Sequence, residues 1–339
     1  MTTAVHKPIA GPLAHTQEWY DLRTFRADNE RPVVFGASEA AVAAGLSKYR
    51  SPFELFFIKR GEVAAQDDDN RIAKSMGHRF EPIVLDIYEE EQGVQLERNQ
   101  PFWFHPTHSF MGCTPDAIAH LLDTQWSVDA KATNFRMFDR TGEDEHKFGE
   151  PGTDQIPLDY LCQAQVQMEV MGVDRCDFPV LRDTTQMVTY TVQRNDELIA
   201  QLVAAQKELA ERIINNDPPE PNFEHTGIRK FLERQFPVVP NSVTECDMVF
   251  RDKWTLLEEY KLRKKKAEER IESLQAELKI LAGNAERVVV QGWDKEVVFT
   301  TVAPTIGTEN HVELAKGNIG KVIRAGSVRM YARNKRKSG

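Results

Sequence analysis

The sequence lacks any apolar run of about 18 residues, so no transmembrane helix is predicted. Residues 1–13 also lack the positively charged start and the apolar stretch of a secretory signal. Cysteine is scarce, and the absence of a Cys-x-x-Cys pair argues against a cysteine-bound iron–sulfur cluster. These absences predict a cytoplasmic protein with reduced thiols. The four cysteines are Cys113, Cys162, Cys176 and Cys246.

Basic residues are also in deficit, since the formal net charge is −9. The excess of acidic over basic residues is not uniform along the chain. No acidic residue follows Glu313 and eight lysines and arginines do, so this segment carries +8 and the residues before it carry −17. A basic C-terminal segment can contact phosphates, and the alternative for the last eight residues is a solubilising tail. An acidic body repels DNA except along a path lined by basic groups, which favours binding in a defined groove.

Length and composition predict one large domain with an appendage, because 339 residues with 41% hydrophobic content can bury a substantial core. The breaker Asp217-Pro218-Pro219-Glu220-Pro221 marks the end of the large domain. A helix is predicted at 196–214, and a long loop at 139–159 is a candidate lid or DNA contact. The predicted parts are a loose N-terminal arm at 1–16, a catalytic domain at 17–215, an irregular linker at 216–250 and an extension at 251–339.

The extension is predicted to contain one long helix at 251–282 and strands at 288–290, 296–301 and 329–331. Within the helix, four apolar residues repeat at 3-4-3 spacing and form a short seam. That seam is compatible with packing on the chain's own body, with a helical hairpin or with a coiled coil between copies. Its members are Ile271, Leu274, Leu278 and Leu281.

The most informative pattern is P-D-x12-D-x-K, formed by Pro115-Asp116 and Asp129-Ala130-Lys131. Residues 126–131 alternate as in a strand, which places Asp129 and Lys131 on one face. Asp116 precedes the apolar run 117–119, and residues 122–124 are a predicted turn. A hairpin would therefore bring two carboxylates and an ammonium together. The alternative is a solvated salt-bridge face, which is common for Asp-x-Lys in a strand.

This set of groups suits phosphodiester hydrolysis. Carboxylate oxygens hold Mg²⁺ together with several waters. The metal lowers the pKa of a bound water and neutralises the charge that builds on the phosphate. A neighbouring lysine can orient or deprotonate the attacking water, because burial and nearby cations depress its pKa. We therefore expect Lys131 to act on the water.

Three further motifs accompany this pattern. Glu81 follows Gly77 and is expected near the start of a helix, either as a third carboxylate or as a partner of the helix macrodipole. Ser38 is expected to cap a helix at 39–44, which is compatible with phosphate binding. Gln163 lies in Tyr-x-x-Gln-x-Gln at 160–165, where the glutamines either face the site or are exposed helix formers. His105 and His108 alone do not predict a zinc site.

Taken in order, these motifs resemble the lambda-exonuclease family, or YqaJ-like viral recombinases, of the PD-(D/E)xK nuclease superfamily. The resemblance spans roughly residues 17–182. It implies an α/β fold with a restriction-endonuclease-like core, in which helices flank a mixed central sheet, and with a C-terminal helical and β extension. The shared elements are Trp-x-x-Leu-Arg at 19–23, Ala-Ser-Glu at 37–39, Glu81, Pro-Asp at 115–116, Asp-x-Lys at 129–131 and Tyr-x-x-Gln-x-Gln at 160–165.

Carried over residue by residue, the resemblance implies that Asp116, Asp129 and the Ala130 carbonyl hold Mg²⁺, with Mn²⁺ as a substitute. Lys131 would position the nucleophilic water. Glu81 would ligate a second metal or hold a metal-bound water. Gln163 would hydrogen-bond the water or the region of Lys131.

The resemblance also implies a site for the terminal 5′-phosphate, formed by Arg31 and Ser38. Arg31 is favoured for this role, because it fits the spacing to Ser38. Arg23 is the alternative, because it fits the Trp-x-x-Leu-Arg context. Thr114 contributes a neighbouring hydroxyl or is a plain loop residue. One departure concerns Asp129, where the lambda-type pattern has Glu, so the metal geometry is expected to shift.

The implied activity is Mg²⁺-dependent 5′-to-3′ exonuclease digestion of one strand of linear double-stranded DNA. Digestion from 5′-phosphorylated ends would leave 3′ single strands for a single-strand annealing protein. The resemblance further implies a trimeric ring of copies around DNA in a bacterial host, encoded by a phage or prophage. Two alternatives remain: an endonuclease of the same fold and a non-catalytic DNA-binding protein.

Overall fold

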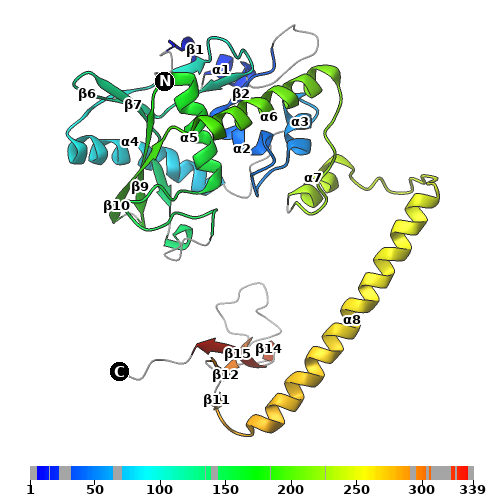
Figure 1. The fold of residues 1–339 in the computed structure, drawn as a ribbon. Coiled ribbons are helices and arrows are strands. Elements are labelled where there is room, and N and C mark those ends of the chain that lie inside the picture. The colour runs from blue at the N-terminus through cyan, green and yellow to red at the C-terminus, as the bar shows by residue number, and fades with distance from the viewer. Residues whose placement is uncertain are drawn as a thin grey trace. The chain divides into compact units, whose positions relative to one another are not determined.

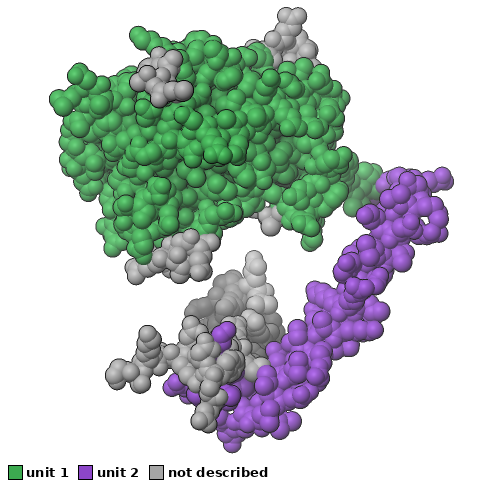
Figure 2. Space-filling model, viewed as in Figure 1, with its two compact units in different colours: residues 1–239 green, residues 240–339 purple. Residues whose placement is uncertain are grey.

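The computed structural model describes residues 6–14, 16–22, 32–63, 71–133, 135–138, 144–183, 185–225, 227–290, 295–302, 305–306, 322–324 and 327–334. The chain forms two compact units, residues 1–239 and 240–339 (Figure 2). The first unit is an α/β structure in which helices pack on mixed sheets (Figure 1). The expected α/β class, with helices flanking a mixed sheet, is thus confirmed.

The larger sheet of the first unit has the strand order β10-β9-β7-β6-β3, and β8 also pairs with β9. β7 and β8 run parallel to β9, whereas the other pairs are antiparallel, so the sheet is mixed. The strands are β3 (Gln95–Arg98), β6 (Ala117–Leu121), β7 (Thr124–Val128), β8 (Lys131–Thr133), β9 (Arg175–Arg182) and β10 (Gln186–Gln193).

The two faces of this sheet are covered by different helices. Phe178 and Val180 of β9 lie in one apolar cluster with residues of α5 (Leu158–Met171). Leu181, the next residue of β9, lies in another cluster with Val84 and Leu85 of α4 (Arg71–Gln92). This alternation follows from the period of two along a strand. The sheet is therefore enclosed between α4 and α5.

A second sheet has the order β1-β4-β5-β2. β2 runs parallel to β5, which leads directly to the predicted site. Residues 1–16 were expected to be a loose arm, but β1 pairs with β4 in this sheet. The sequence pattern missed β1 because its Gly and Pro are poor strand formers. The strands are β1 (Ile9–Leu13), β2 (Phe35–Gly36), β4 (Pro101–Phe104) and β5 (Met111–Cys113).

Helix α4 differs from the prediction at its start. It begins at Arg71, so Glu81 lies in the middle of the helix rather than near its N-terminus. The sequence pattern predicts a start near Gly77, yet a single glycine inside a helix costs only about 1 kcal/mol and is tolerated. The interpretation of Glu81 as a partner of the helix macrodipole is therefore wrong, since that effect is confined to the first turn.

The remaining helices of the first unit pack around these sheets. Helix α6 confirms the predicted helix at 196–214, and Asn195 caps it by accepting the N–H of Leu198 at 3.0 Å. Helix α7 was missed in a segment predicted to be irregular. The elements are α1 (Gln17–Leu22), η1 (Ala37–Glu39), α2 (Ala40–Ala43), α3 (Pro52–Lys59), η3 (Phe135–Met137), α6 (Asp196–Asn215) and α7 (Ile228–Gln235).

The second unit contains the long helix α8 (Met248–Ala282), which Asp247 caps by accepting the N–H groups of Val249 and Phe250. None of the residues of α8 is buried. The predicted strands are confirmed by a three-stranded sheet of order β11-β12-β15, beside a short β13–β14 pair. Their bounds are β11 (Arg287–Val289), β12 (Lys295–Val302), β13 (Thr305–Ile306), β14 (Val322–Arg324) and β15 (Ser327–Asn334).

Across the described ranges, no helix combines the length and the apolar character that a membrane span requires.

Candidate active site

The β6–β7 hairpin brings the two parts of the P-D-x12-D-x-K pattern together. Its turn lies at residues 122–123, as predicted, and Ala117 pairs with Val128 across the hairpin. Asp116 Oδ2 accepts the N–H of Ala130 at 2.8 Å. Lys131 Nζ donates to Asp129 Oδ2 at 2.5 Å. Two carboxylates and an ammonium therefore lie within one hydrogen-bonded group.

The backbone around Asp129 explains this geometry. The predicted single strand at 126–131 is divided into β7 and β8, with Asp129 and Ala130 between them. The register against β9 is nevertheless constant, since Val128 pairs with Asp177 and Lys131 with Val180. The N–H of Asp129 donates to the Asp177 carbonyl at 2.9 Å and continues the ladder. Asp129 and Lys131 thus share a face, as the pattern predicts.

The pKa of Lys131 differs from the one expected from the sequence. Burial acts to lower the pKa of the Lys131 ammonium, but the charges of Asp129 and Asp116 outweigh it and raise the pKa above its usual value. The expected depression of the Lys131 pKa is therefore not found, because two carboxylates adjoin the ammonium. Lys131 Nζ also lies 5.2 Å from the ring centroid of Tyr160. The side chain is a cation at neutral pH.

The pKa of Asp116 is raised well above its usual value, first by burial and then by the charge of Asp129. The charge of Glu81 on α4 raises it further. Glu81 is about one-third exposed and lies 3.8 Å from His78 Nδ1. Three carboxylates thus influence one point, and Lys131 compensates only part of their charge.

Gln163 on α5 faces this group rather than solvent. Its Nε2 donates to Asp129 Oδ2 at 2.6 Å. Gln165 and Gln167 are buried: Gln165 bonds the main chain at Gln193 and Asn195, and Gln167 accepts from the Cys176 thiol. The interpretation of these glutamines as exposed helix formers is therefore wrong.

The oxygen atoms of this site are suitable ligands for a hard divalent cation. Within the part of the chain that the structure describes, only one oxygen each of Asp116 and Asp129 accepts a hydrogen bond, and the second oxygen of each can face an ion. Carboxylate and carbonyl oxygens are the ligands that Mg²⁺ and Mn²⁺ prefer. A cation would also offset the mutual repulsion that raises the Asp116 pKa.

Ser38 lies exposed in η1, directly after β2. Since Gly36 pairs with Gly112 in parallel, Ser38 and Thr114 follow their strands at the same end of the sheet. Ser38 does not cap a helix, because the N-cap residues are Gly36 for η1 and Glu39 for α2. Glu39 Oε2 accepts the N–H of Gly36 at 2.9 Å. The ammonium of Lys59, only 1% exposed, holds that carboxylate at 2.7 Å.

Of the other predicted phosphate-binding residues, the structure describes only Thr114. The Thr114 hydroxyl accepts the indole N–H of Trp19 at 3.2 Å, which ties α1 to the segment that carries Asp116. Arg23 and Arg31 lie outside the described residues.

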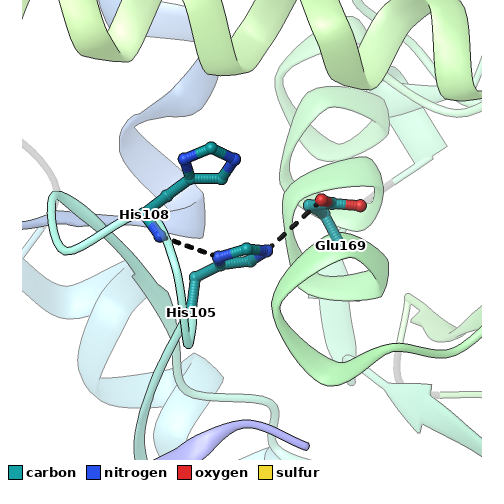
Figure 3. Close-up of side chains that lie close together, drawn as sticks. All are labelled: His105, His108 and Glu169. Atoms are coloured by element: carbon teal, nitrogen blue, oxygen red, sulfur yellow. Dashed lines mark hydrogen bonds and ion pairs between the residues drawn. The ribbon is translucent and has the colours of Figure 1, made fainter. Parts of the chain in front are cut away.

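His105, His108 and Glu169 form a second polar group (Figure 3). The ligand atoms of His105, His108 and Glu169 are within 4.8 Å of one another, so Glu169 supplies a third ligand that the sequence did not reveal. Imidazole nitrogens suit zinc rather than Mg²⁺. His105 Nδ1 accepts the N–H groups of Thr107 and His108, and Nε2 lies 3.3 Å from Glu169.

His105 and Glu169 of this group already have protein partners. Arg194 forms an ion pair with the Glu169 carboxylate. The hydrogen bond from His105 and the charge of Arg194 lower the pKa of Glu169 to about 2. Burial, and then the charge of His105, lower the pKa of His108. A cation here would compete with Arg194, so we assign the group a structural role in joining α5 to the loop before β5.

Comparisons with known proteins relate part of this sequence to one protein family. Residues 18–174 match the YqaJ-like viral recombinase domain. The matched segment, termed the YqaJ-like domain below, contains Glu81, Asp116, Asp129, Lys131 and Gln163. The family resemblance seen in the sequence is confirmed.

Three similar proteins define the relationship further. The uncharacterized protein YqaJ of Bacillus subtilis (strain 168) is 24% identical over 216 residues, which are 63% of this chain and 63% of that protein. The chain thus spans under two thirds of this relative. An alkaline exonuclease, LHK-Exo from Laribacter hongkongensis, is 23% identical, with 60% of this chain and 94% of that chain covered and a TM-score of 0.42. A phage related exonuclease from Haemophilus somnus 129PT is 15% identical, with 56% and 98% covered and a TM-score of 0.39.

Proposed function

We propose that the YqaJ-like domain is a divalent-metal-dependent deoxyribonuclease that digests one strand of linear double-stranded DNA from 5′ to 3′. The observation that carries the proposal is the hydrogen-bonded group of Asp116, Asp129, Lys131 and Gln163. This group combines hard oxygen ligands with a fixed ammonium, which are the components that phosphodiester hydrolysis requires.

Asp116, Asp129, Glu81 and the Ala130 carbonyl would hold Mg²⁺, or Mn²⁺ in its place. When bound, the metal would lower the pKa of a coordinated water and offset charge on the scissile phosphate. Gln163 would keep Asp129 Oδ2 in place, so that the other oxygen of this carboxylate faces the ion. The shorter Asp129, in place of Glu, would draw the ion toward the end of β7.

Lys131 would orient the attacking water and stabilise charge on a phosphate oxygen. Its raised pKa favours this role over that of a general base, because a base must first lose its proton. The Asp129 carboxylate and the Tyr160 ring fix the ammonium in direction. Such a preorganised donor stabilises a transition state without reorganising during the reaction.

Substrate recognition would occur at the end of the sheet where Ser38 and Thr114 lie. Ser38 would bind a terminal 5′-phosphate together with Arg31, with Arg23 as the alternative arginine. The parallel β2–β5 pairing supports this assignment, since it directs the turn after β2 to the same side as Asp116. Residues 144–157, without helix or strand, are a candidate DNA contact.

By resemblance, the protein would act at DNA ends as a trimeric ring. Its 3′ single-stranded product would pass to an annealing protein, in a bacterial cell infected by a phage or carrying a prophage. An endonuclease of the same fold is the second candidate, because the metal group would serve internal cleavage equally well. The two differ in whether they attack closed circular DNA.

The substitution Lys131→Ala tests the assignment of the site. It should lower Mg²⁺-dependent nucleotide release from linear duplex DNA by on the order of 10²-fold or more, as the loss of one preorganised donor does. DNA binding should persist, since Lys131 does not support the fold. Lys207→Ala, at an exposed position of α6, is the matched control and should retain activity. Full cleavage by Lys131→Ala would contradict the assignment.

A further inference from the structure

The carboxylate of Asp177 lies on the α4 side of the sheet and is surrounded by donors. Asp177 is 0% exposed. Arg175 donates to both oxygens, at 2.8 and 2.6 Å, and the Thr191 hydroxyl donates to Oδ1 at 2.9 Å. The Tyr88 hydroxyl donates to Oδ2 at 2.5 Å. A buried carboxylate needs such partners, and this one uses them to join β9, β10 and α4.

The main chain of the same residue supports the metal group. The Asp177 carbonyl accepts the N–H of Asp129 at 2.9 Å. Asp177 therefore fixes Asp129 through its backbone and α4 through its side chain. No other described residue makes hydrogen bonds to both Asp129 and α4.

Tyr88 connects this carboxylate to Glu81. The two residues are seven apart on α4, so they lie on nearly the same side of the helix, about two turns from each other. Tyr88 is fully buried, and its oxygen also accepts the indole N–H of Trp126 at 2.9 Å. Burial, and then the charge of Asp177, raise its pKa, so the hydroxyl remains a donor at neutral pH.

The Tyr88–Asp177 hydrogen bond is directional, whereas apolar packing is not. Val84 and Leu85 pack α4 against the sheet, but apolar contacts are non-directional and permit small shifts of a helix along its axis. A hydrogen bond weakens steeply when its length or angle changes. The Tyr88–Asp177 bond therefore fixes the position of α4, and with it the position of Glu81.

We propose that Tyr88 and Asp177 are positioning residues that hold Glu81 at the distance from Asp116 and Asp129 that binding of a divalent cation requires. This inference rests on the proposed function, because it assigns Glu81 to the metal site. Mg²⁺ and Mn²⁺ bind well only when their oxygen ligands are correctly spaced. Loss of an outer partner of a metal ligand typically weakens metal binding by about 10–100-fold.

Tyr88→Phe removes only the hydroxyl and tests the proposal. Isothermal titration with Mn²⁺ should show binding weakened by about 10–100-fold in this variant. Tyr190→Phe is the matched control, because Tyr190 is equally buried and its hydroxyl bonds the Gly149 carbonyl at 2.8 Å, away from the carboxylates. The control should bind Mn²⁺ with unchanged affinity while losing a comparable hydrogen bond.

A double-mutant cycle separates positioning from a general loss of stability. In a Glu81→Gln background, Tyr88→Phe should have little further effect on Mn²⁺ affinity, because the ligand that it positions is gone. Equal weakening in both backgrounds, or wild-type affinity in Tyr88→Phe, would overturn the inference. If the wild type shows no Mn²⁺ binding that Asp116→Asn abolishes, the proposed function itself fails, and the inference with it.

Discussion

At the scale of one residue, hydrogen bonds within the fold fix the position of Asp129, which is a proposed metal ligand. Its N–H continues the β9 ladder, and its Oδ2 accepts from both Lys131 and Gln163. These three bonds leave the side chain little freedom, and Asp129 is 2% exposed. A carboxylate held in this way presents its other oxygen in a fixed direction. Preorganisation of this kind is what a metal ligand requires.

Glu169 gives a prediction on stability and pH. Its pKa of about 2 lies below the usual 4.5, so its stabilising effect is complete above pH 4.5 and is lost as the pH falls toward 2. Glu169→Gln should therefore lower the free energy of unfolding at pH 7 by about 2–3 kcal/mol. Urea unfolding from pH 7 to pH 3 measures the difference, which should shrink toward pH 3.

The exposed Glu208 on α6 provides the control for this prediction. Glu208→Gln should change the free energy of unfolding only slightly at either pH, because exposed ion pairs contribute little. A difference between Glu169→Gln and the wild type that stays constant with pH would contradict the linkage to Glu169.

The sequence predicted those site residues that lie close to one another along the chain. The strand period relates Asp129 to Lys131, and one hairpin joins them to Asp116. It did not predict the contact between Tyr88 and Asp177, which are 89 residues apart, or the role of Glu169 beside His105. Such contacts depend on how helices pack on the sheet, and no local period encodes that packing.

The β6–β7 hairpin determines the site at the scale of elements. Its two-residue turn forces Leu122 into the left-handed region at φ 53°, where a β-carbon is unfavourable. Leu122→Gly should therefore raise the free energy of unfolding by about 1 kcal/mol. Leu122 is 96% exposed, so the substitution removes almost no packing. Thermal or urea unfolding measures the gain.

Asp123→Gly is the matched control in the same turn, because Asp123 does not have a positive φ. This variant should gain no stability and should lose some through the added freedom of the unfolded chain. An equal gain in both variants would show that the strain does not reside at Leu122.

The elements that the sequence missed are those formed by tertiary contacts. Helix α7 follows a proline-rich breaker, yet Phe231 is fully buried against Phe53 of α3 at a centroid distance of 5.8 Å. β1 is held by pairing with β4. The elements with strong local signals, α6, α8 and the β6–β7 hairpin, were predicted. Local propensity is a weak guide where packing decides.

The whole molecule has an uneven distribution of charge. The residues up to Glu313 carry −17 and the segment after it carries +8. Basic groups near an active site concentrate DNA, while an acidic surface elsewhere limits non-specific binding. The seam of Ile271, Leu274, Leu278 and Leu281 on α8 is exposed, and its coverage by the chain itself or by another copy stays a prediction.

We propose that this molecule is a metal-dependent nuclease that starts at DNA ends. Digestion of three DNAs in Mg²⁺ tests this proposal: a 5′-phosphorylated linear duplex, the same duplex with 5′-hydroxyl ends, and a closed circular plasmid. Nucleotides should be released fastest from the phosphorylated linear duplex, and the circle should stay intact. Linearisation of the circle, or no release from any of the three, would contradict it.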